Sequence, residues 1–194
     1  LDRATARAQA LSLLQAVGIA AAEERLRAYP HELSGGMRQR VALAIAMSCN
    51  PDLLIADEPT TALDVTIQAQ ILHLIRSLLV KDRGAGALLI THDLGVVARV
   101  CDRVAIMYAG EIVETGPVAA ILGAPLHPYT QALLRAAPSD RAARGQLPTI
   151  PGRVPPLTDR PNGCAFRARC GQAVAVCATP EARARHLPMP GREV

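Results

Sequence analysis

A short apolar run that ends in two carboxylates constrains this sequence more than any other feature. The run LLIA at 53–56 is continuously apolar, as is typical of a strand in a parallel sheet that is covered on both faces. Asp57 and Glu58 follow it directly. Two adjacent carboxylates at the end of a buried strand are costly unless their charges have a task. A helix N-cap at the strand end would account for one acid but not for both.

The pattern on either side of this run predicts an α/β fold in layers. Apolar residues at helical spacing come before it, an amphipathic stretch follows, and more short apolar runs come later. Strands that alternate with helices favour a sheet with helices packed on it, and Gly110 indicates a hairpin turn. The expected helices cover 1–17, 23–27, 37–48 (a buried helix), 65–80, 94–100 and 129–136, and the expected strands cover 53–56, 87–90, 103–107 and 112–114.

A histidine follows the next expected strand. Thr91-His92-Asp93 comes directly after the apolar run at 87–90. A lone histidine at a strand end is more often structural. Here it would lie beside Asp57 and Glu58, because functional side chains of parallel sheets gather at the carboxyl ends of the strands. From that position His92 can donate a hydrogen bond to a terminal phosphate, whichever tautomer is present.

The segment LSGGMRQR at 33–40 predicts a helix N-terminus that is open to an anion. Ser34 is a good N-cap, and Gly35 and Gly36 remove side chains from the first turn. Unpaired N–H groups and the positive end of the helix dipole suit a phosphate. Taken alone, the segment fits an ordinary capped helix after a loop better than a phosphate site.

Four segments in this order resemble an ABC ATPase: LSGGMRQR, LLIADEP, TTALDVT and THDLGVVA resemble its signature, Walker B, D-loop and switch-histidine segments. The resemblance implies the P-loop NTPase-type fold, ATP and Mg²⁺ as cofactors, and a dimer of two such subunits around two ATP molecules. Asp57 would then belong to the magnesium shell. Glu58 and His92 would be catalytic, with Glu58 as the general base.

The same resemblance implies contacts across the dimer. The signature would touch the ATP that the opposite subunit holds, and Asp64 of the D-loop would lie at the dimer interface, coupling the two sites. The signature residues expected to take part are Ser34, Gly35, Gly36, Met37 and Gln39.

One motif of this family has no counterpart here. The Walker A loop needs Gly-Lys-Ser/Thr, whereas the single lysine, Lys81, precedes Asp82. The Gln-containing loop also has no clear match before the signature. We therefore expect 1–124 to be a partial ABC ATPase domain that starts within its helical subdomain and is inactive alone.

The remaining segment, 125–194, is expected to be a loop-rich extension. HPYTQALLRAAP at 127–138, IPGRVPPL at 150–157 and GCAFRARCGQAVAVC at 163–177 resemble the C-terminal extension of oligopeptide and dipeptide importer ATPases. This implies an ATP-hydrolysing subunit that energises peptide import by docking on two transmembrane permease subunits, with an extracytoplasmic solute-binding protein as indirect partner. Nickel or another small solute stays open as the substrate. A non-transport ABC ATPase and an inactive fragment also stay open as interpretations of the chain.

Three cysteines in the extension raise the question of a metal centre. Cys164, Cys170 and Cys177 are spaced more widely than the cysteine pairs of zinc sites. Some members of the importer group that this extension resembles hold a four-cysteine iron–sulfur cluster, so a 4Fe–4S site is one hypothesis. No fourth cysteine follows, and plain buried thiols are the competing hypothesis. Cys49 and Cys101 are expected in the core.

Charge and hydropathy limit the partners and the location. Residues 1–134 carry 11 Lys+Arg and 13 Asp+Glu, whereas 135–194 carry 10 and 4. The basic segment has Phe166 as its only aromatic residue, so it lacks the stacking side chains of single-strand binders, and no nucleic-acid partner is expected.

No apolar run reaches the ~18 residues of a membrane-spanning helix, and no leader is evident. The expected location is the cytoplasmic face of the membrane, as a peripheral subunit.

Overall fold

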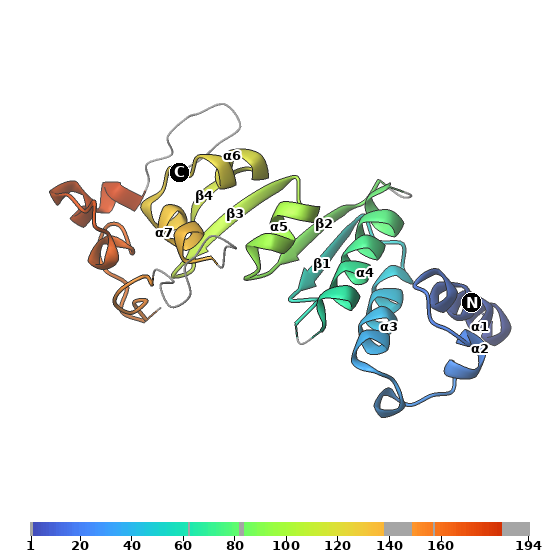
Figure 1. Cartoon of the computed structure of the whole chain (residues 1–194). Helices are drawn as coiled ribbons and strands as arrows, with labels where there is room; N and C mark the ends of the chain where they lie inside the picture. The colour runs from blue at the N-terminus through green and yellow to red at the C-terminus, as the bar shows by residue number, and fades with distance from the viewer. Residues whose placement is uncertain (1, 62, 82–83, 138–148, 157, 184–194) are drawn as a thin grey trace. The chain divides into compact units, whose positions relative to one another are not determined.

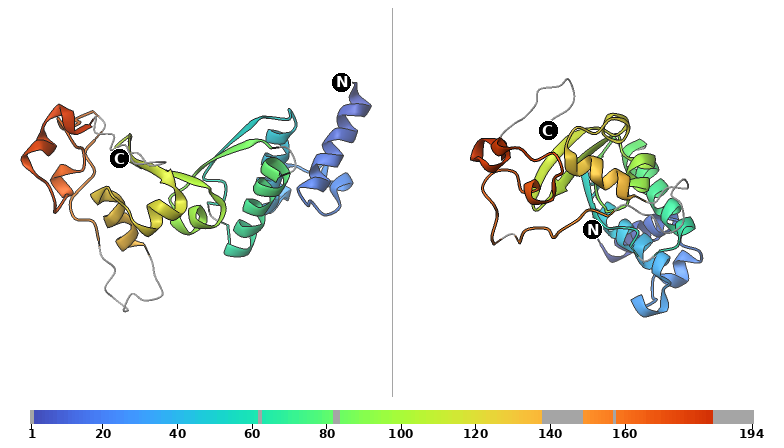
Figure 2. Two further views of the ribbon diagram at one scale, coloured as in Figure 1. Left: turned by 90° about the horizontal axis from the view of Figure 1, so that it is seen from above. Right: turned by 60° about the vertical axis from the view of Figure 1, so that its left-hand side comes forward.

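The computed structural model describes residues 2–61, 63–81, 84–137, 149–156 and 158–183. They belong to two compact units, Leu1–Asp93 and Leu94–Val194, which are considered separately (Figures 1 and 2). No helix within the described ranges is long and apolar enough to cross a membrane. The first unit contains α1 (Arg3–Ala16), α2 (Ala22–Arg25), η1 (Pro30–Glu32), α3 (Gly35–Met47), β1 (Leu53–Asp57), α4 (Val65–Ile75), the π-helical turn η2 (Arg76–Lys81) and β2 (Gly86–Ile90).

Helix α1 begins and ends where its sequence contains capping residues, which confirms the helix predicted at 1–17. The Asp2 carboxylate accepts two backbone N–H groups of the first turn. At the other end Gly18 takes φ +76°, the left-handed conformation that glycine adopts at little cost. The N–H of Ile19 then donates to the carbonyl of Leu14 at 2.9 Å, which closes the helix in a Schellman motif.

The core of the first unit lies between the helices and one face of a two-stranded parallel sheet. Strands β1 and β2 pair in parallel from Leu53 opposite Gly86 to Asp57 opposite Ile90. Helices α3 and α4 lie along the same side of this pair (Figure 1). The buried side chains of this core include Leu14, Val17, Ile19, Leu43, Met47, Leu54, Ile71 and Ile75.

The prediction that β1 is covered on both faces is wrong for the part of the chain that the structure describes. Leu54 is buried, but Leu53 and Ile55 are 55% and 60% exposed, and Leu88 and Ile90 of β2 are 51% and 47% exposed. Side chains of a strand alternate between faces, so these four lie together on one face. Both packed helices cover the opposite face, which leaves this one open in the described ranges.

Two further expectations about burial fail for related reasons. Helix α3 begins at Gly35 and is buried along one face only, with Ile45 67% exposed, because only that face meets α1 and α4. Cys49 is exposed, since α3 ends at Met47 and the cysteine lies beyond the packed part of the helix. Cys101 is half-buried.

The second unit is built on an antiparallel hairpin. Strand β3 turns into β4 at Ala109 and Gly110, both with positive φ as tight hairpin turns require, and this confirms the hairpin predicted at Gly110. Helix α6 follows β4 directly and was not predicted from the sequence. The elements are α5 (Leu94–Val100), β3 (Arg103–Tyr108), β4 (Glu111–Pro117), α6 (Val118–Gly123), α7 (Pro128–Ala136), η3 (Arg167–Arg169), η4 (Ala175–Ala178) and η5 (Pro180–Arg183).

An aromatic cluster connects the hairpin with the segments that follow it. The rings of Tyr108, Tyr129 and Phe166 lie 4.6–5.4 Å apart in tilted and edge-on arrangements, which aromatic pairs prefer. Arg169 donates to the Tyr108 hydroxyl at 3.2 Å and to the carbonyls of Pro151 and Ile150 at 2.7 and 2.9 Å. Three segments distant in sequence are therefore packed into one unit.

A buried carboxylate holds the start of α7. Glu114 is only 1% exposed, and its two oxygens accept the N–H groups of Leu126 and His127 at 2.9 and 3.1 Å. His127 in turn caps α7, because its Nδ1 accepts the N–H of Tyr129 at 3.0 Å. The HPYT segment is thus anchored to β4. The predicted boundary between 124 and 125 differs from the division into compact units and stays a prediction.

Candidate functional site

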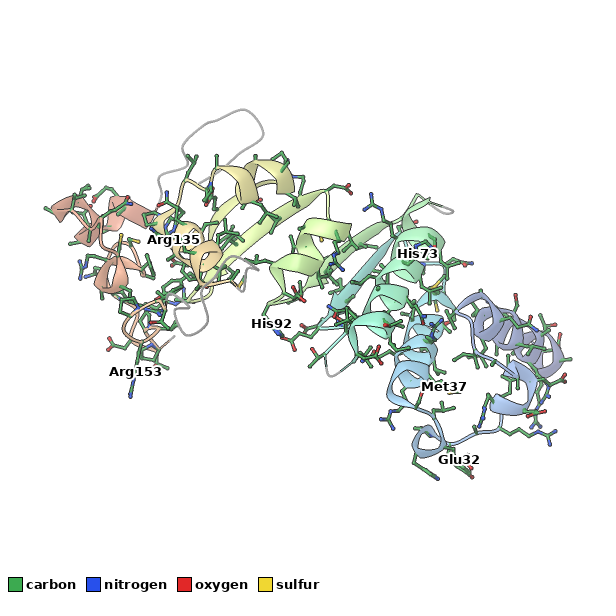
Figure 3. The ribbon with its side chains drawn as sticks, in the orientation of Figure 1. Glu32, Met37, His73, His92, Arg135 and Arg153 are labelled. Carbon is green, nitrogen blue, oxygen red and sulfur yellow. The ribbon has the colours of Figure 1, made fainter. Side chains whose placement is uncertain are left out.

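The two predicted catalytic side chains lie together at the carboxyl ends of β1 and β2. The Nδ1 atom of His92 is 3.1 Å from Oε1 of Glu58. The backbone brings them there, because the N–H of Glu58 donates to the carbonyl of Ile90 at 2.9 Å, two residues before the histidine. Figure 3 shows His92 just beyond the end of β2. The proximity expected from parallel strands is therefore present in the structure.

The backbone of Glu58 is held in an uncommon conformation. Its φ is +44°, in the left-handed region that residues other than glycine rarely adopt. The N–H of Thr61 donates to the carbonyl of Glu58 at 3.2 Å, so the chain turns sharply after the strand. Positive φ in non-glycine residues is concentrated at functional sites, where the surrounding structure compensates for the strain.

Hydrogen bonds favour the ionised form of the Glu58 carboxyl group. The Thr61 hydroxyl donates to Oε2 of Glu58 at 2.8 Å. This bond, followed by the bond to His92, holds the pKa of Glu58 below its usual value. The sequence pattern did not single out Thr61. The signal was its position three residues after Glu58, in a turn that begins at Pro59.

The other residues predicted for this edge of the sheet lie at the end of a strand and at the start of a helix. Asp57 is the last residue of β1 and is exposed. Asp64 is the N-cap of α4, and its Oδ1 accepts the N–H of Ile67 at 2.9 Å. A capping role therefore accounts structurally for Asp64, whereas among the described residues no capping bond involves Asp57.

The signature segment forms the N-terminus of α3 and packs against the region around Asp64. Ser34 caps the helix by accepting the N–H of Met37 at 3.3 Å. A Cβ atom added to Gly36 would lie 2.8 Å from Cγ2 of Ile67, and one added to Gly35 would lie 3.6 Å from Leu63. The absence of a side chain at Gly36 is therefore a packing requirement as well as a means of exposing N–H groups.

Two further signature residues face different surroundings. The side chain of Met37 packs against the core of the first unit, and Figure 3 shows it on α3. Gln39 is half-buried. Arg40, to which the sequence pattern assigned no role, donates to the carbonyl of Val17 at 2.5 Å and to Oε1 of Gln70 at 2.6 Å. Its guanidinium thus connects α3 with the end of α1 and with α4.

The three cysteines of the extension do not form a metal site in the described residues. Within those ranges no group of three or more His, Cys, Asp or Glu side chains is arranged to hold a metal ion. Cys164 and Cys170 pack against the aromatic cluster, and the N–H of Cys164 donates to the carbonyl of Cys177 at 2.9 Å. Burial raises the pKa of the Cys164 thiol. The predicted iron–sulfur ligand set is therefore not confirmed.

Family comparisons agree with this arrangement. A family described as "ABC transporter" matches residues 2–61, and one described as "Oligopeptide/dipeptide transporter, C-terminal region" matches residues 113–177. Among solved structures, the ATP-binding cassette MJ0796, described as a dimer in a post-hydrolysis state with ADP and Pi, is similar with a TM-score of 0.54 and 30% identity over 61% of this chain and 49% of that one. A second dimeric structure of the same bacterial cassette gives a TM-score of 0.52 and 32% identity, with the same coverage.

The fold is that of part of an ABC ATPase cassette. The two matched segments belong to the ABC transporter family and to the C-terminal region of oligopeptide/dipeptide transporters, and the chain is similar to ATP-binding proteins of peptide and dipeptide transporters.

Curated relatives place the similarity within this group. The chain is 56% identical to a probable peptide ABC transporter ATP-binding protein of Sinorhizobium fredii, over 91% of this chain and 53% of the relative. It is 55% identical to a putative peptide import ATP-binding protein of Brucella ovis, over 91% and 55%. It is 53% identical to the dipeptide transport ATP-binding protein DppD of Escherichia coli, over 93% and 55%. The chain thus spans about half the length of the curated relatives it matches.

Proposed function

We propose that this chain is part of an ATP-hydrolysing subunit that energises the import of dipeptides or oligopeptides. The observation that carries the proposal is the Glu58–His92 pair, with side-chain atoms 3.1 Å apart at the ends of two parallel strands. The oligopeptide/dipeptide transporter match at 113–177 supports the substrate class.

The residues of the site suggest how hydrolysis would proceed. Glu58 is ionised and exposed, so its carboxylate can accept a proton from a water molecule that attacks the terminal phosphate. His92 donates its Nδ1–H to one oxygen of that carboxylate and holds it in place, and only with both ring nitrogens protonated can it also donate to a phosphate oxygen. In phosphoryl transfer, positioning and charge stabilisation supply most of the rate enhancement, and both side chains act in this way.

Asp57 is the residue that would hold the magnesium ion. Carboxylate oxygens are preferred ligands of Mg²⁺, and Asp57 is an exposed carboxylate next to Glu58. The ion would neutralise charge on the phosphates of ATP. This donor fits the cofactor, although a single carboxylate needs the nucleotide and water to complete the coordination.

The signature would serve a second subunit. We infer that the N-terminus of α3, with Ser34, Gly35 and Gly36, contacts ATP held by another ABC ATPase subunit, while Asp64 lies at the interface of the two. Met37 and Gln39 belong to the same signature segment, although the Met37 side chain packs against the core of the first unit. The pair of subunits would dock on two transmembrane permease subunits at the cytoplasmic face of the membrane, and a solute-binding protein would deliver the peptide outside.

Transport by the complete complex tests this function. The full-length subunit, reconstituted with its permease subunits and binding protein in proteoliposomes, is expected to import a labelled dipeptide only when ATP and Mg²⁺ are present. Uptake of nickel but not of peptide would show that the transported solute is nickel and not a peptide. ATP hydrolysis without uptake of any solute would favour a role outside transport.

The iron–sulfur hypothesis for the extension is separate from this proposal. Cys164, Cys170 and Cys177 belong to one unit, but as arranged in the described residues they do not fit a cluster. No step of the hydrolysis depends on one. Anaerobic purification of the full-length subunit, with its absorption spectrum and iron content, decides the point: colourless, iron-free protein excludes the cluster.

A further inference from the structure

Both oxygens of the Glu58 carboxylate have a hydrogen-bonding partner. Oε1 is 3.1 Å from Nδ1 of His92, on the strand-end segment after β2. Oε2 accepts the hydroxyl of Thr61 at 2.8 Å, from the turn after β1. The histidine was expected from the sequence, whereas the threonine bond is seen only in the structure. The two partners approach from different segments, so together they define the plane of the carboxylate.

Thr61 is itself fixed relative to Glu58 by the backbone. Its N–H donates to the carbonyl of Glu58 at 3.2 Å, which closes the turn. Glu58 is further held by the bond from its own N–H to the carbonyl of Ile90 at 2.9 Å. The N–H and the carbonyl of Glu58 are therefore both hydrogen-bonded, which holds its left-handed backbone in place. Because the side chain of Thr61 is short, the turn itself fixes its hydroxyl beside the carboxylate.

An exposed carboxylate that lacked such partners would sample several rotamers. Glu58 is exposed, so packing does not restrict its side chain. Fixing a catalytic group within a narrow range of orientations matters, because small displacements of a reacting group lower the rate strongly. Hydrogen bonds are then the available means of holding this carboxylate.

We propose that Thr61 is a positioning residue that orients the Glu58 carboxylate so that Oε1 stays beside His92 and faces the attacking water. The proposal rests on the proposed function of Glu58. It gives the hydroxyl at 61 a role that a simple turn residue would not have. Serine can replace threonine in this role, whereas valine keeps the shape of the side chain and lacks the hydroxyl.

The first experiment tests the contact itself in the full-length subunit. Three-bond NMR couplings of the Glu58 side chain report how many rotamers it populates. We expect a single rotamer in the wild type and in Thr61→Ser, and averaged couplings in Thr61→Val. Thr61 is exposed, so the variants are expected to fold, and Thr61→Ala repeats the loss of the hydroxyl with a smaller side chain. Unaltered couplings in both Thr61→Val and Thr61→Ala would overturn the proposal.

The second experiment tests its consequence in the full-length subunit within its transporter. Thr61→Val is expected to lower kcat for ATP hydrolysis about tenfold and to leave the KM for ATP unchanged, while Thr61→Ser restores most of kcat. A kcat that is unchanged in Thr61→Val, or a defect that Thr61→Ser does not repair, contradicts a positioning role. If Glu58→Gln retains full activity, the proposed function fails instead, and the NMR result for Thr61 still stands on its own.

Discussion

At the scale of single residues, Gly163 marks a point at which this fold tolerates no ordinary side chain. Gly163 has φ +77°, and a Cβ atom there would overlap the carbonyl oxygen of Cys177. The backbones of the two segments therefore touch because residue 163 is glycine. Glu58 adopts a similar backbone conformation at φ +44°, although it carries a full side chain.

This close approach predicts a selective loss of stability. Gly163→Ala is expected to lower the free energy of unfolding of the second unit by at least about 1–3 kcal/mol, since it adds backbone strain and a clash. Gly171→Ala is the matched control, because a Cβ atom at Gly171 meets no atom within 4 Å. Chemical denaturation followed by Phe166 and tyrosine fluorescence measures both. Equal stability of the two variants would show that the close contact between residue 163 and the Cys177 carbonyl does not contribute to the stability of the second unit.

At the same scale, the sequence could predict the Glu58–His92 pair but not its third member. Both residues directly follow short apolar runs, and parallel pairing brings such positions together without further information. Thr61 reaches the carboxylate only because Glu58 takes a positive φ and the chain turns after it. That conformation depends on the bond to the Ile90 carbonyl, which is a tertiary contact.

At the level of elements, the stability of helix α7 depends on the protonation of its cap. His127 accepts the N–H of Tyr129 through Nδ1, which requires that nitrogen to be unprotonated. Burial lowers the pKa of His127, and the nearby Glu114 carboxylate opposes this shift. The unfolded chain therefore binds a proton at higher pH than the folded chain does, so stability is lost as the pH falls below about 6.5 and through the lower folded-state pKa.

The pH dependence of unfolding tests this cap. We expect the wild type to lose thermal stability between about pH 7 and pH 5 more steeply than His127→Asn, because asparagine can cap the helix without titrating in this range. The difference between the two proteins isolates His127 from the carboxylates that both share. Parallel pH profiles for the two proteins would show that His127 does not control α7.

A second prediction concerns the junction of α1, α3 and α4. Arg40→Met removes a guanidinium that donates to the Val17 carbonyl and to Gln70, and it leaves a carbonyl at the buried residue 17 without this donor. We expect a loss of about 1–3 kcal/mol in the free energy of unfolding of the first unit. Arg38→Met is the control, since Arg38 is exposed and its bond to the Pro30 carbonyl is 3.5 Å long. Similar effects of the two substitutions would contradict the connecting role of Arg40.

Element prediction from the sequence succeeded where local signals were strong. Ser34 was expected as a helix N-cap and caps α3, and the hairpin follows from Gly110, whereas the caps Asp2 and Asp64 of α1 and α4 are seen only in the structure. Helix α6 was missed because it is a single apolar turn and a half directly after a strand. The burial of α3 was overestimated, since the continuously apolar run at 41–47 does not show which face of the helix packs against a neighbour.

At the scale of the whole molecule, one sheet face of the first unit is an open aliphatic surface in the described residues. Leu53, Ile55, Leu88 and Ile90 lie on it, each about half exposed. An exposed apolar surface on a short two-stranded sheet favours association. We expect the purified 194-residue chain to self-associate at micromolar concentration.

Substitutions on the two faces of β1 distinguish this surface from the core. The double variant Ile55→Gln/Leu88→Gln is expected to reduce self-association, measured by sedimentation velocity, with little change in unfolding. Leu54→Gln, on the buried face, is expected to unfold the first unit instead. Self-association that is unaffected by the double variant would place the associating surface elsewhere.

The central claim is that Glu58 activates the water that hydrolyses ATP, and phosphate release by the full-length subunit in its transporter tests it most directly. We predict that Glu58→Gln lowers the rate of phosphate release by a factor of about 10² or more, while ATP still binds and holds the two subunits together. The control Glu24→Gln, on the exposed surface of α2, is expected to keep the wild-type rate. A Glu58→Gln variant that releases phosphate as fast as the wild type would contradict the account.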